Sequence, residues 1–517
     1  MNIAVAVAVG FLVVALLLPF KPLALRCADW LLSLASWRLI AVGEILLALP
    51  LLIWGAGIAD WYFYSARIAL FVIGLLLMGE GLYILMVDAA PLQKLLRFMI
   101  KHYYLIAIPM SLICLLLSIF ILARSYIGPI PDVSSCKSGS TLSVSCVVSN
   151  PEDMVITPDN RFILLSEFGG SGPLNEAGPG NLALVDAQTK LPVPLAIIYS
   201  DNTWGDGQCV KTADSPFGPH GIDLVERSDG RHQLAVVNHM GGESIEMFEL
   251  VAVDSAAQDN AARLTRWGLV WRGCVEAPEE NFINDVSLLS DGSFFVSHMY
   301  SHKFTTADFL YQLIAKQDTG YVLHWDDHTG FSQVPGTQGS QPNGLVFDEA
   351  SNILYVAFNI ADKLSAIDVI TGQVLHSFYA DALDNLVLDQ GNLWLTSLDH
   401  AVLDVLVCEE NSLCPLPFTV TKLDASSLTE IEHWSFTQQP FGLPSVAMPF
   451  QTETLNQVIV GTFMGDRLAY FDVGLNLEPT LRPKLAPNVQ PLEESLEEPS
   501  PLGNFPDIEP IAEQVDR

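Results

Sequence analysis

Oxygen-bearing side chains recur in this chain where short apolar runs begin. Glu152, Asn284, Asn343, Asp384 and Asn385 all stand at such positions. Calcium takes about six to eight oxygen ligands from carboxylates, amides, backbone carbonyls and water. Each residue alone is an ordinary turn or cap residue, but turn chemistry does not explain their recurrence at one phase of a repeat. We therefore predict that these five side chains bind one calcium ion and leave positions open for water and substrate.

A second set of residues is interleaved with the first. Asp153 and Asp285 directly follow Glu152 and Asn284 in the sequence. Successive side chains of a strand point to opposite faces, so the members of each pair serve two depths of one channel. We predict a second, structural calcium ion deeper in the channel, held by Asp153, Asp285 and the backbone carbonyl of Ile222.

Two histidines add acid–base chemistry to this set. His220 opens one apolar run, and His239 ends the next run along the chain. A hairpin would bring the two rings together, where they could act as a general base and its orienting partner. A lone surface or core histidine is the commoner fate of either residue. His298 and His302 are weaker candidates.

The element that positions these residues is a sixfold repeat. Each copy has a small polar opening, an apolar run, a turn and an apolar strand, and the copies begin at Pro151, Pro219, Ile283, Pro342, Leu383 and Pro444. A repeat of roughly 40 to 65 residues built from short strands is typical of a β-propeller. If each copy opens on the strand nearest the axis, one central channel receives Glu152, His220, Asn284, Asn343, Asp384 and Ser445.

The first quarter of the chain differs from the repeat in composition. It contains four long apolar runs, at residues 2–20, 39–58, 67–88 and 103–123. About 20 apolar residues suffice for a helix to cross a bilayer, so we predict four transmembrane helices. Lys and Arg gather between the first and second runs and between the third and fourth, which places both chain ends and the propeller outside the cytoplasm.

The predicted organisation is therefore an α-helical membrane domain followed by an all-β six-bladed propeller. We assign residues 1–127 to the membrane domain, 128–475 to the exported propeller, and 476–517 to a disordered acidic tail rich in proline. The short loops between the helices favour an anchor, which could also form a homodimer, over a transporter.

The cysteines agree with an exported propeller, because six of the eight lie beyond the membrane domain. The close pairs Cys136 with Cys146 and Cys408 with Cys414 could close small loops, which leaves Cys209 and Cys274 by elimination. Spacing alone does not establish connectivity.

The charge is strongly acidic. The net charge is −33, and because residues 1–127 carry eight Lys and Arg against five Asp and Glu, the exported part carries −36. This balance argues against nucleic acid and anionic lipid headgroups as partners of the exported part. It suits a calcium-loaded protein, although simple solubility explains it equally well.

Several strings in the repeat resemble the serum paraoxonase/arylesterase family and, more distantly, gluconolactonase and strictosidine synthase-like propellers. These strings are PEDMVI, FGPHGIDL, LAVVNH, INDVSLL, PNGLVF, LDNLVLD, NLWL, PSVA and VIVGTF, which span about residues 145–472. The resemblance implies a six-bladed propeller with two calcium ions and a histidine dyad at His220 and His239. It assigns the catalytic ion to Glu152, Asn284, Asn343, Asp384 and Asn385, and the structural ion to Asp153, Ile222 and Asp285.

The chain also departs from that family. The family has one amino-terminal helix, whereas four are predicted here. No cysteine follows Cys414 to join the two ends of the propeller by a disulfide. Gln341 and Pro342 replace the apolar residues that precede the asparagine of the fourth blade in the family. The expected activity is calcium-dependent hydrolysis of lactones or aryl esters, with Ca²⁺ polarising the carbonyl group and the dyad activating water. The alternatives are a calcium-stabilised propeller that binds another protein without catalysis, and a metal-independent lyase. The serine-hydrolase motif GxSxG and the zinc motif HExxH are both absent from the sequence.

Overall fold

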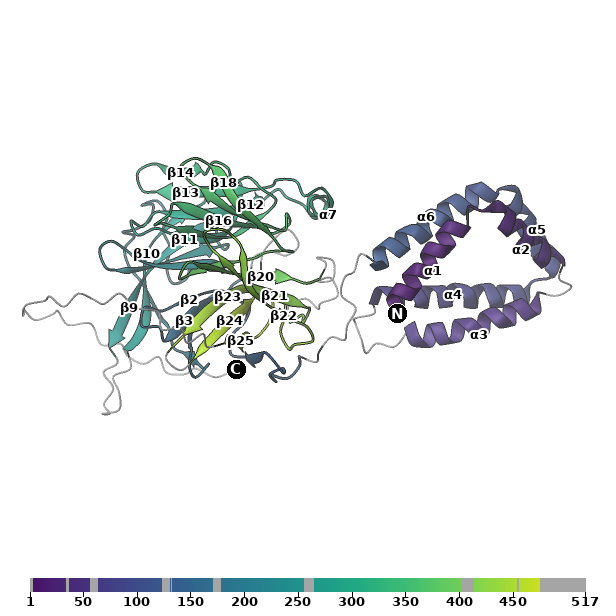
Figure 1. The fold of residues 1–517 in the computed structure, drawn as a ribbon, viewed down its shortest axis with the longest axis horizontal. Coiled ribbons are helices and arrows are strands. Elements are labelled where there is room, and N and C mark those ends of the chain that lie inside the picture. Colours follow the sequence, from purple (N-terminus) through teal and green to yellow (C-terminus); the bar gives the residue numbers. More distant parts are fainter. Residues whose placement is uncertain are drawn as a thin grey trace, which may run out of the picture. The chain divides into compact units, whose positions relative to one another are not determined.

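A computed structural model of the chain describes residues 3–33, 37–55, 64–122, 131, 133–170, 178–254, 265–400, 413–452 and 455–474. Figure 1 shows a group of helices and a ring of β-sheets, which are described separately below. The predicted tail at residues 476–517 lies outside the described ranges.

Six helices precede the sheets. Their bounds are α1 Ile3–Leu17, α2 Lys21–Ser33, α3 Arg38–Gly55, α4 Tyr64–Met86, α5 Ala89–Lys101 and α6 Tyr103–Leu122. Four of them, α1, α3, α4 and α6, correspond to the four apolar runs of the sequence. The other two, α2 and α5, fold from segments that the sequence analysis treated as loops.

The prediction of four transmembrane helices is not supported in that form. Within the described ranges, no single helix is both long and apolar enough to cross a membrane. Two bent pairs meet the requirement only when each pair is taken together: Val9–Leu17 with Lys21–Ser33, bent by 91°, and Ala90–Lys101 with Tyr103–Ile119, bent by 84°. Pro19 lies in the first break, where its ring and its missing N–H interrupt a helix.

The sheets form six blades, which confirms the predicted six-bladed propeller. Blade 1 consists of β2 Pro151–Ile156, β3 Phe162–Glu167, β4 Asn181–Asp186 and β5 Pro192–Val193. Blade 2 consists of β7 Pro219–Glu226, β8 His232–Asn238, β9 Ser244–Asp254, β10 Thr265–Glu276 and a parallel outer strand, β6 Ala196–Tyr199. Blade 3 consists of β11 Asn281–Leu288, β12 Phe294–Ser301, β13 Tyr321–Asp326 and β14 Gly330–Gln333, with helix α7 Thr306–Ala315 inserted after β12.

The remaining blades follow in sequence order. Blade 4 consists of β15 Pro342–Asp348, β16 Ile353–Phe358, β17 Lys363–Asp368 and β18 Gln373–Tyr379. Blade 5 consists of β19 Leu386–Asp389, β20 Asn392–Leu398, β21 Phe418–Asp424 and β22 Glu430–Phe436. Blade 6 consists of β23 Pro444–Gln451, β24 Asn456–Thr462, β25 Leu468–Asp472 and β1 Ser143–Ser145.

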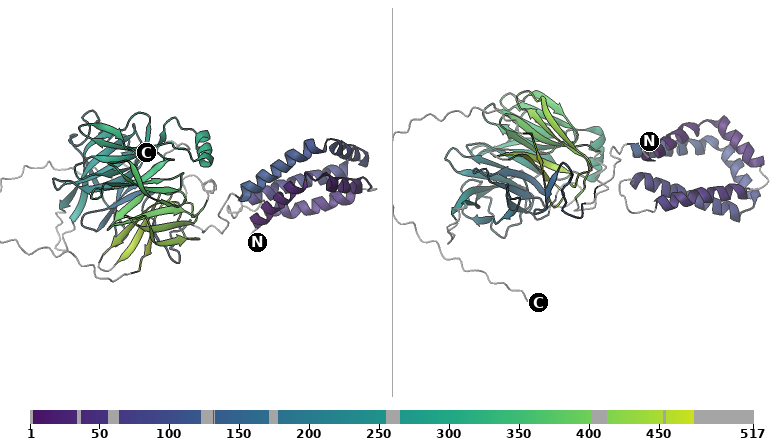
Figure 2. Two further views of the ribbon diagram at one scale, coloured as in Figure 1. Left: turned by 45° about the horizontal axis from the view of Figure 1, so that its top comes forward. Right: turned by 60° about the horizontal axis from the view of Figure 1, so that its bottom comes forward.

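The strand that completes the last blade comes from the start of the propeller. β1 pairs antiparallel with β25, with Ser143 opposite Tyr470 and Ser145 opposite Leu468. The first strands β2, β7, β11, β15, β19 and β23 contact one another in turn, and β23 returns to β2. Figures 1 and 2 show this ring from three directions. The pairing of β1 with β25 joins the two ends of the ring without a covalent bond.

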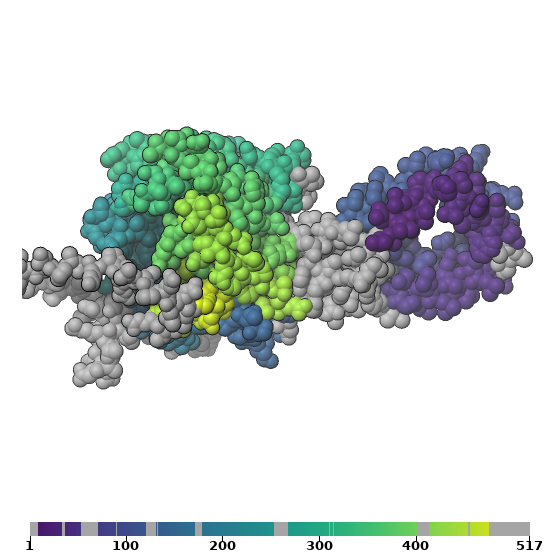
Figure 3. Space-filling model, in the orientation of Figure 1, coloured from purple at the N-terminus to yellow at the C-terminus, as the bar shows by residue number. Residues whose placement is uncertain are grey.

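The apolar core lies between the blades. Each of six core clusters combines residues of two neighbouring blades; for example, Leu164 of blade 1 packs in the same cluster as Leu234 and Phe248 of blade 2. The other five clusters join blades 1 and 6, 2 and 3, 5 and 6, 4 and 5, and 3 and 4. Successive blades are therefore packed side by side, as the colour sequence in Figure 3 shows. A single blade buries neither face alone, so the fold forms only as a closed ring.

Two disulfides join cysteines within the described residues of the propeller. Cys136 bonds Cys146, and Cys209 bonds Cys274, as the sequence suggested. The third expected pair involves Cys408, which lies outside the described residues. Structural disulfides persist in oxidising compartments, so the propeller belongs to an extracellular or periplasmic setting.

Candidate active site and metal centre

The inner strands share a local distortion where the predicted site residues lie. The pairing register shifts within the first residues of five of them: after Pro151 in β2, Pro219 in β7, Ile283 in β11, Pro342 in β15 and Pro444 in β23. A β-bulge re-aims the side chains beside it and is common next to functional sites. The repeat of the sequence therefore encodes a repeated bulge as well as a repeated strand.

Glycines allow the inner strands to approach closely at this level. A Cβ atom on Gly221 would lie 2.4 Å from Oδ1 of Asp285, and one on Gly344 would lie 2.4 Å from Cα of Asn385. Neither distance is compatible with a side chain. The glycine in the strings PHG and PNG is thus required by the neighbouring blade, and it lets polar groups of adjacent blades converge.

The five residues predicted for the first calcium ion converge in this way. Glu152, Asn284, Asn343 and Asp384 line one pocket of about 220 Å³. Asn385 reaches the same point because its Nδ2 atom donates to Oε1 of Glu152 over 2.8 Å. All five side chains are buried. Residues separated by more than 230 positions in the sequence therefore surround one small volume.

Four oxygen atoms of this set have no hydrogen-bond partner in the described part of the chain. They are Oε2 of Glu152 and the Oδ1 atoms of Asn284, Asn343 and Asn385, all of them buried. A buried acceptor without a partner costs about 1–3 kcal/mol, so a bound cation or water at these four atoms would stabilise the site. Carboxylate and amide oxygens are the donors that calcium prefers, and the set fits such an ion.

The described residues contain no metal-binding cluster made only of His, Cys, Asp and Glu side chains. Among the described residues, no group of three or more His, Cys, Asp or Glu side chains is arranged to hold a metal ion. Three of the five converging residues here are asparagines, which donate amide oxygens and fall outside that class. The donor set therefore suits a hard cation such as calcium better than zinc, which prefers His and Cys.

The residues predicted for the second ion adopt a different arrangement. Oδ2 of Asp153 accepts the backbone N–H of Ile222 over 2.7 Å, and Oδ2 of Asp285 accepts that of Leu345 over 2.8 Å. Each carboxylate also accepts the N–H of the residue that follows it. Asp223 bonds the N–H of Leu288 in the same manner over 2.7 Å. These carboxylates fasten one blade to the next, and each oxygen retains a lone pair.

Burial favours the neutral form of the four carboxyl groups near the propeller axis. Burial raises the pKa of Glu152 to about 8, against a partial opposing effect of the bond from Asn385. Burial, followed by the charge of neighbouring carboxyls, also raises the pKa values of Asp153, Asp285 and Asp384. In the described part of the chain, none of these four pairs with Lys or Arg. The cluster therefore binds either protons or a cation.

The two predicted histidines are in direct contact. Nδ1 of His220 lies 2.8 Å from Nε2 of His239, and Nδ1 of His239 lies 3.0 Å from both carboxylate oxygens of Glu243. A carboxylate only accepts hydrogen bonds, so Nδ1 of His239 carries the proton and its Nε2 is an acceptor. His220 must then donate from Nδ1, which leaves the lone pair of its Nε2 atom for the pocket.

Burial keeps this histidine pair neutral. It lowers the pKa of His220 to about 3 and also lowers that of His239, although the bond to Glu243 opposes the second shift. Aromatic rings fix both imidazoles: Phe168 stacks on His220 at 4.2 Å between ring centroids, and Phe282 stacks on His239 at 4.8 Å. His220 is therefore held in the form that accepts a proton.

Glu243 was not predicted as a site residue. It lies in the turn Met240–Gly241–Gly242–Glu243 after β8, four residues beyond His239. An acidic residue in the tight turn next to a candidate histidine was the available signal. Ser445, which was predicted to face the channel, donates its hydroxyl to the backbone carbonyl of Glu152.

The two weaker histidine candidates lie at the edge of the site. His298 is buried, and its Nδ1 atom lies 3.3 Å from the carbonyl oxygen of Phe282. Nε2 of His302 lies 3.8 Å from Glu243, and its side chain is 43% exposed. Neither residue lines the pocket that contains His220.

Comparisons with known proteins leave the family open. No family model matches the sequence, and no curated protein matches it. Among solved structures, the chain is similar to a luciferin-regenerating enzyme, with 10% identity, a TM-score of 0.38, and coverage of 65% of this chain and 96% of that chain. It is also similar to regucalcin, a calcium-binding protein from Agrobacterium tumefaciens, with 11% identity, a TM-score of 0.34, and coverage of 63% and 90%. The paraoxonase resemblance of the sequence thus stays a prediction, and the site has to be interpreted from its own residues.

Proposed function

We propose that this chain is a calcium-dependent hydrolase of lactones and aryl esters, exported and anchored by its helices. The observation that carries the proposal is the placement of His220: its Nε2 atom lies 3.5 Å from Oε1 of Glu152, in the pocket lined by atoms suited to a cation. A propeller that needed calcium only for stability would gain nothing from an oriented imidazole pair at this point.

The cation would be held by Glu152, Asn284, Asn343, Asp384 and Asn385, and a second by Asp153, Asp285 and the carbonyl of Ile222. When bound, calcium supplies Lewis acidity towards the carbonyl oxygen of an ester. The two carboxylates of this set would match the two positive charges of the ion, and the three asparagines would add oxygen ligands without further charge. Glu152 and Asp384 would bind the cation, and the cation would in turn keep these two buried carboxylates ionised.

The histidines handle the proton. His220 takes a proton from the attacking water at Nε2, because its Nδ1 atom is already bonded to His239. His239 and Glu243 position that imidazole and stabilise the charge it acquires. The proton returns to the alkoxide that leaves when the ester or lactone bond breaks. The products are one carboxylic acid and one alcohol, joined in a single molecule when the substrate is a lactone.

The walls of the pocket set its polarity. Phe168, Phe282, Met299 and Phe463 contribute apolar side chains to its lining. An apolar lining binds the acyl or aryl part of an ester and excludes bulk water from the reacting atoms. The volume of about 220 Å³ admits a small ring or a short acyl group.

The test uses the full chain with phenyl acetate and a series of acyl lactones, with calcium and after chelation. We expect hydrolysis that requires calcium and that falls by at least about 100-fold in His220→Gln, since general base catalysis contributes about 10²–10⁴-fold. His376→Gln is the matched control, because His376 is exposed on β18. Full activity without calcium, or in His220→Gln, would exclude this mechanism. Calcium binding without any hydrolysis would favour the protein-binding alternative.

A further inference from the structure

The two short helices α2 and α5 combine basic and apolar side chains in a distinctive arrangement. On α5, Lys94, Arg97 and Lys101 stand three and four residues apart, so they form one stripe, and all three are exposed. α2 carries Lys21, Arg26 and Asp29, so its net charge is also positive. By contrast, α1 and α6 contain no charged residue in Ile3–Leu17 and Tyr103–Leu122. The positive charge is thus concentrated on the two helices that were not predicted from the sequence.

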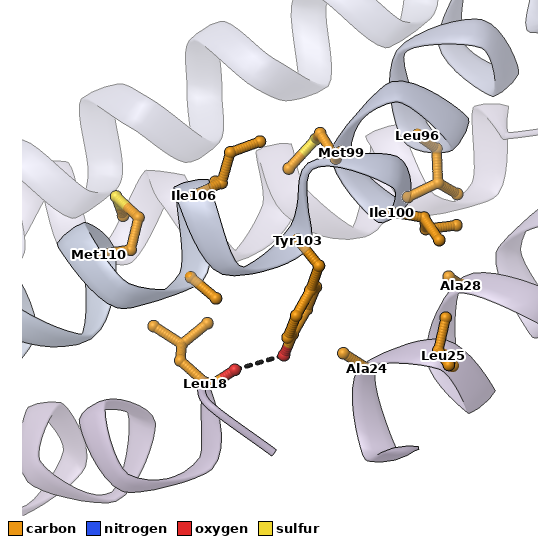
Figure 4. Close-up of a pocket in the computed structure, with 11 residues that line it drawn as sticks. Leu18, Ala24, Leu25, Ala28, Leu96, Met99, Ile100, Tyr103, Ile106 and Met110 are labelled. Carbon is orange, nitrogen blue, oxygen red and sulfur yellow. Dashed lines mark hydrogen bonds between the residues drawn. The ribbon is translucent and has the colours of Figure 1, made fainter. Parts of the chain in front are cut away.

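The inner faces of α2 and α5 are already used within the helical part. Ala24, Leu25 and Ala28 of α2, with Leu96 and Ile100 of α5, line an apolar cavity of about 300 Å³. Figure 4 shows these side chains, together with the hydroxyl of Tyr103, which donates to the carbonyl oxygen of Leu18 across the break after α1. The basic stripe lies on the side of α5 that does not line this cavity.

The apolar surface continues beyond the covered face. On α5, Leu95 is 51% exposed and Phe98 is 55% exposed, and both flank the basic stripe. On α2, Leu23 is 42% exposed and Trp30 is 59% exposed, close to Arg26. Large exposed apolar side chains beside Lys and Arg are typical of helices that lie in a membrane interface, where tryptophan is also enriched.

The bends give α2 and α5 the direction that this role needs. α2 follows α1 at 91°, and α5 precedes α6 at 84°. A helix nearly perpendicular to its neighbour lies in the plane of a bilayer interface when that neighbour enters the bilayer along its normal, which does not require the neighbour to span the bilayer. The bend between α1 and α2 and the bend between α5 and α6 share this geometry, and both α2 and α5 carry net positive charge.

We propose that the outer faces of α2 and α5 form a binding surface for anionic phospholipid headgroups. Lys94, Arg97 and Lys101 contact the phosphates, while Leu95 and Phe98 enter the boundary of the acyl region. The positive stripe specifies a negatively charged bilayer as the occupant. The inference extends the anchoring part of the proposed function and is independent of hydrolysis.

The test measures which lipids surround the intact chain. The full chain is placed in lipid nanodiscs that contain phosphatidylcholine with about one quarter phosphatidylglycerol, and a donor dye is attached to Cys27, a free and exposed cysteine of α2. Energy transfer to a trace of headgroup-labelled phosphatidylglycerol is compared with transfer to labelled phosphatidylcholine. We expect at least about threefold enrichment of the anionic lipid near Cys27, which 0.5 M salt abolishes.

The variants separate local charge from net charge. Replacing Lys94, Arg97 and Lys101 together by Gln should reduce the enrichment to about one, because each basic residue near the surface contributes up to about fivefold. The matched control replaces Lys137, Arg231 and Lys303 of the exported part by Gln and should keep the enrichment. The salt series on the unchanged chain gives an answer that does not depend on how the variants fold.

Three results would overturn the proposal. One is equal transfer to both lipids in the unchanged chain, and another is equal loss of enrichment in both triple variants. The third is failure of the chain to associate with discs of either composition, which would contradict the anchor as well. Discs that hold the chain without any lipid preference would contradict the binding surface alone.

Discussion

Removal of calcium should invert the pH dependence of stability, because of the buried carboxyls at the axis. The pKa of Glu152 is about 8 in the folded chain, against 4.5 for an ordinary glutamate. Between these values the folded state holds a proton that the unfolded state has lost. Stability of the calcium-free chain therefore falls as the pH rises from about 4.5 to 8, by about 1.4 kcal/mol for each pH unit.

The magnitude follows from that interval. A shift of about three units or more gives roughly 4 kcal/mol for Glu152 alone, which corresponds to about 5 °C in the melting temperature of a propeller of this size. Asp153, Asp285 and Asp384 shift in the same direction and add to the effect. With excess calcium the trend should reverse, because the ion binds the ionised carboxylates and stabilises the folded state by mass action.

The assay is thermal unfolding of the full chain at pH 5 and pH 8, chelated or with calcium. Glu152→Gln lacks the titrating group at position 152, so the chelated variant should be more stable at pH 8 than the chelated unchanged chain, while calcium should stabilise it less. Glu226→Gln, at an exposed position of β7, is the control and should behave like the unchanged chain. A chelated chain as stable at pH 8 as at pH 5, with no response to calcium, would refute the reasoning.

Three further predictions concern single features of the propeller. Glu243→Gln should lower kcat about 10- to 100-fold without changing calcium affinity or KM, since the amide can turn its NH₂ group to the ring and reverse the tautomer; steady-state kinetics and calcium titration check this. Gly221→Ala should lower the free energy of unfolding by about 2–4 kcal/mol in denaturant titrations, because its Cβ atom would enter the neighbouring blade, whereas Gly207→Ala has open space and should be neutral. Replacing Cys209 and Cys274 by Ser should cost about 4 kcal/mol, given their separation of 65 residues, and an unchanged melting temperature would contradict a structural role for that bond.

The propeller could be predicted because each copy of the repeat has the same local pattern of a polar opening, an apolar run, a turn and an apolar strand. The inner strands β2, β7 and β15 begin at Pro151, Pro219 and Pro342, the residues at which three of the predicted copies begin. The closing strand Ser143–Ser145 was not predicted, because its partner Leu468–Asp472 is more than 320 residues away and three residues carry no periodic signal. Closure of a ring is a long-range contact, which local patterns do not encode.

The helical part was predicted less well. Apolar length identified α1, α3, α4 and α6, but α2 and α5 were treated as loops because their charged residues interrupt the apolar runs. Charged residues at every third or fourth position are compatible with an amphipathic helix. Counting Lys and Arg between the apolar runs does not test whether those residues have helical spacing. Of the two bends near 90°, only the first has a proline, Pro19, between its helices, so little in the sequence indicates either bend.

The site was predicted in its residue types but not in its connections. The convergence of Glu152, Asn284, Asn343 and Asp384 follows from their common phase in the repeat. The bond from Ile222 to Asp153 and the contact of His239 with Glu243 depend on the bulge and on a turn, which set side-chain directions. Sequence reasoning therefore supplied the candidate residues, and the structure supplied the contacts between them.

Calorimetric titration of calcium into the chelated full chain tests the central claim most directly. The account predicts binding by the unchanged chain, binding weakened by about tenfold or more in Asn343→Ala, and binding retained in His220→Gln, because Asn343 donates an oxygen ligand and His220 does not. No heat of binding to the unchanged chain, or equal affinity in Asn343→Ala, would contradict the account.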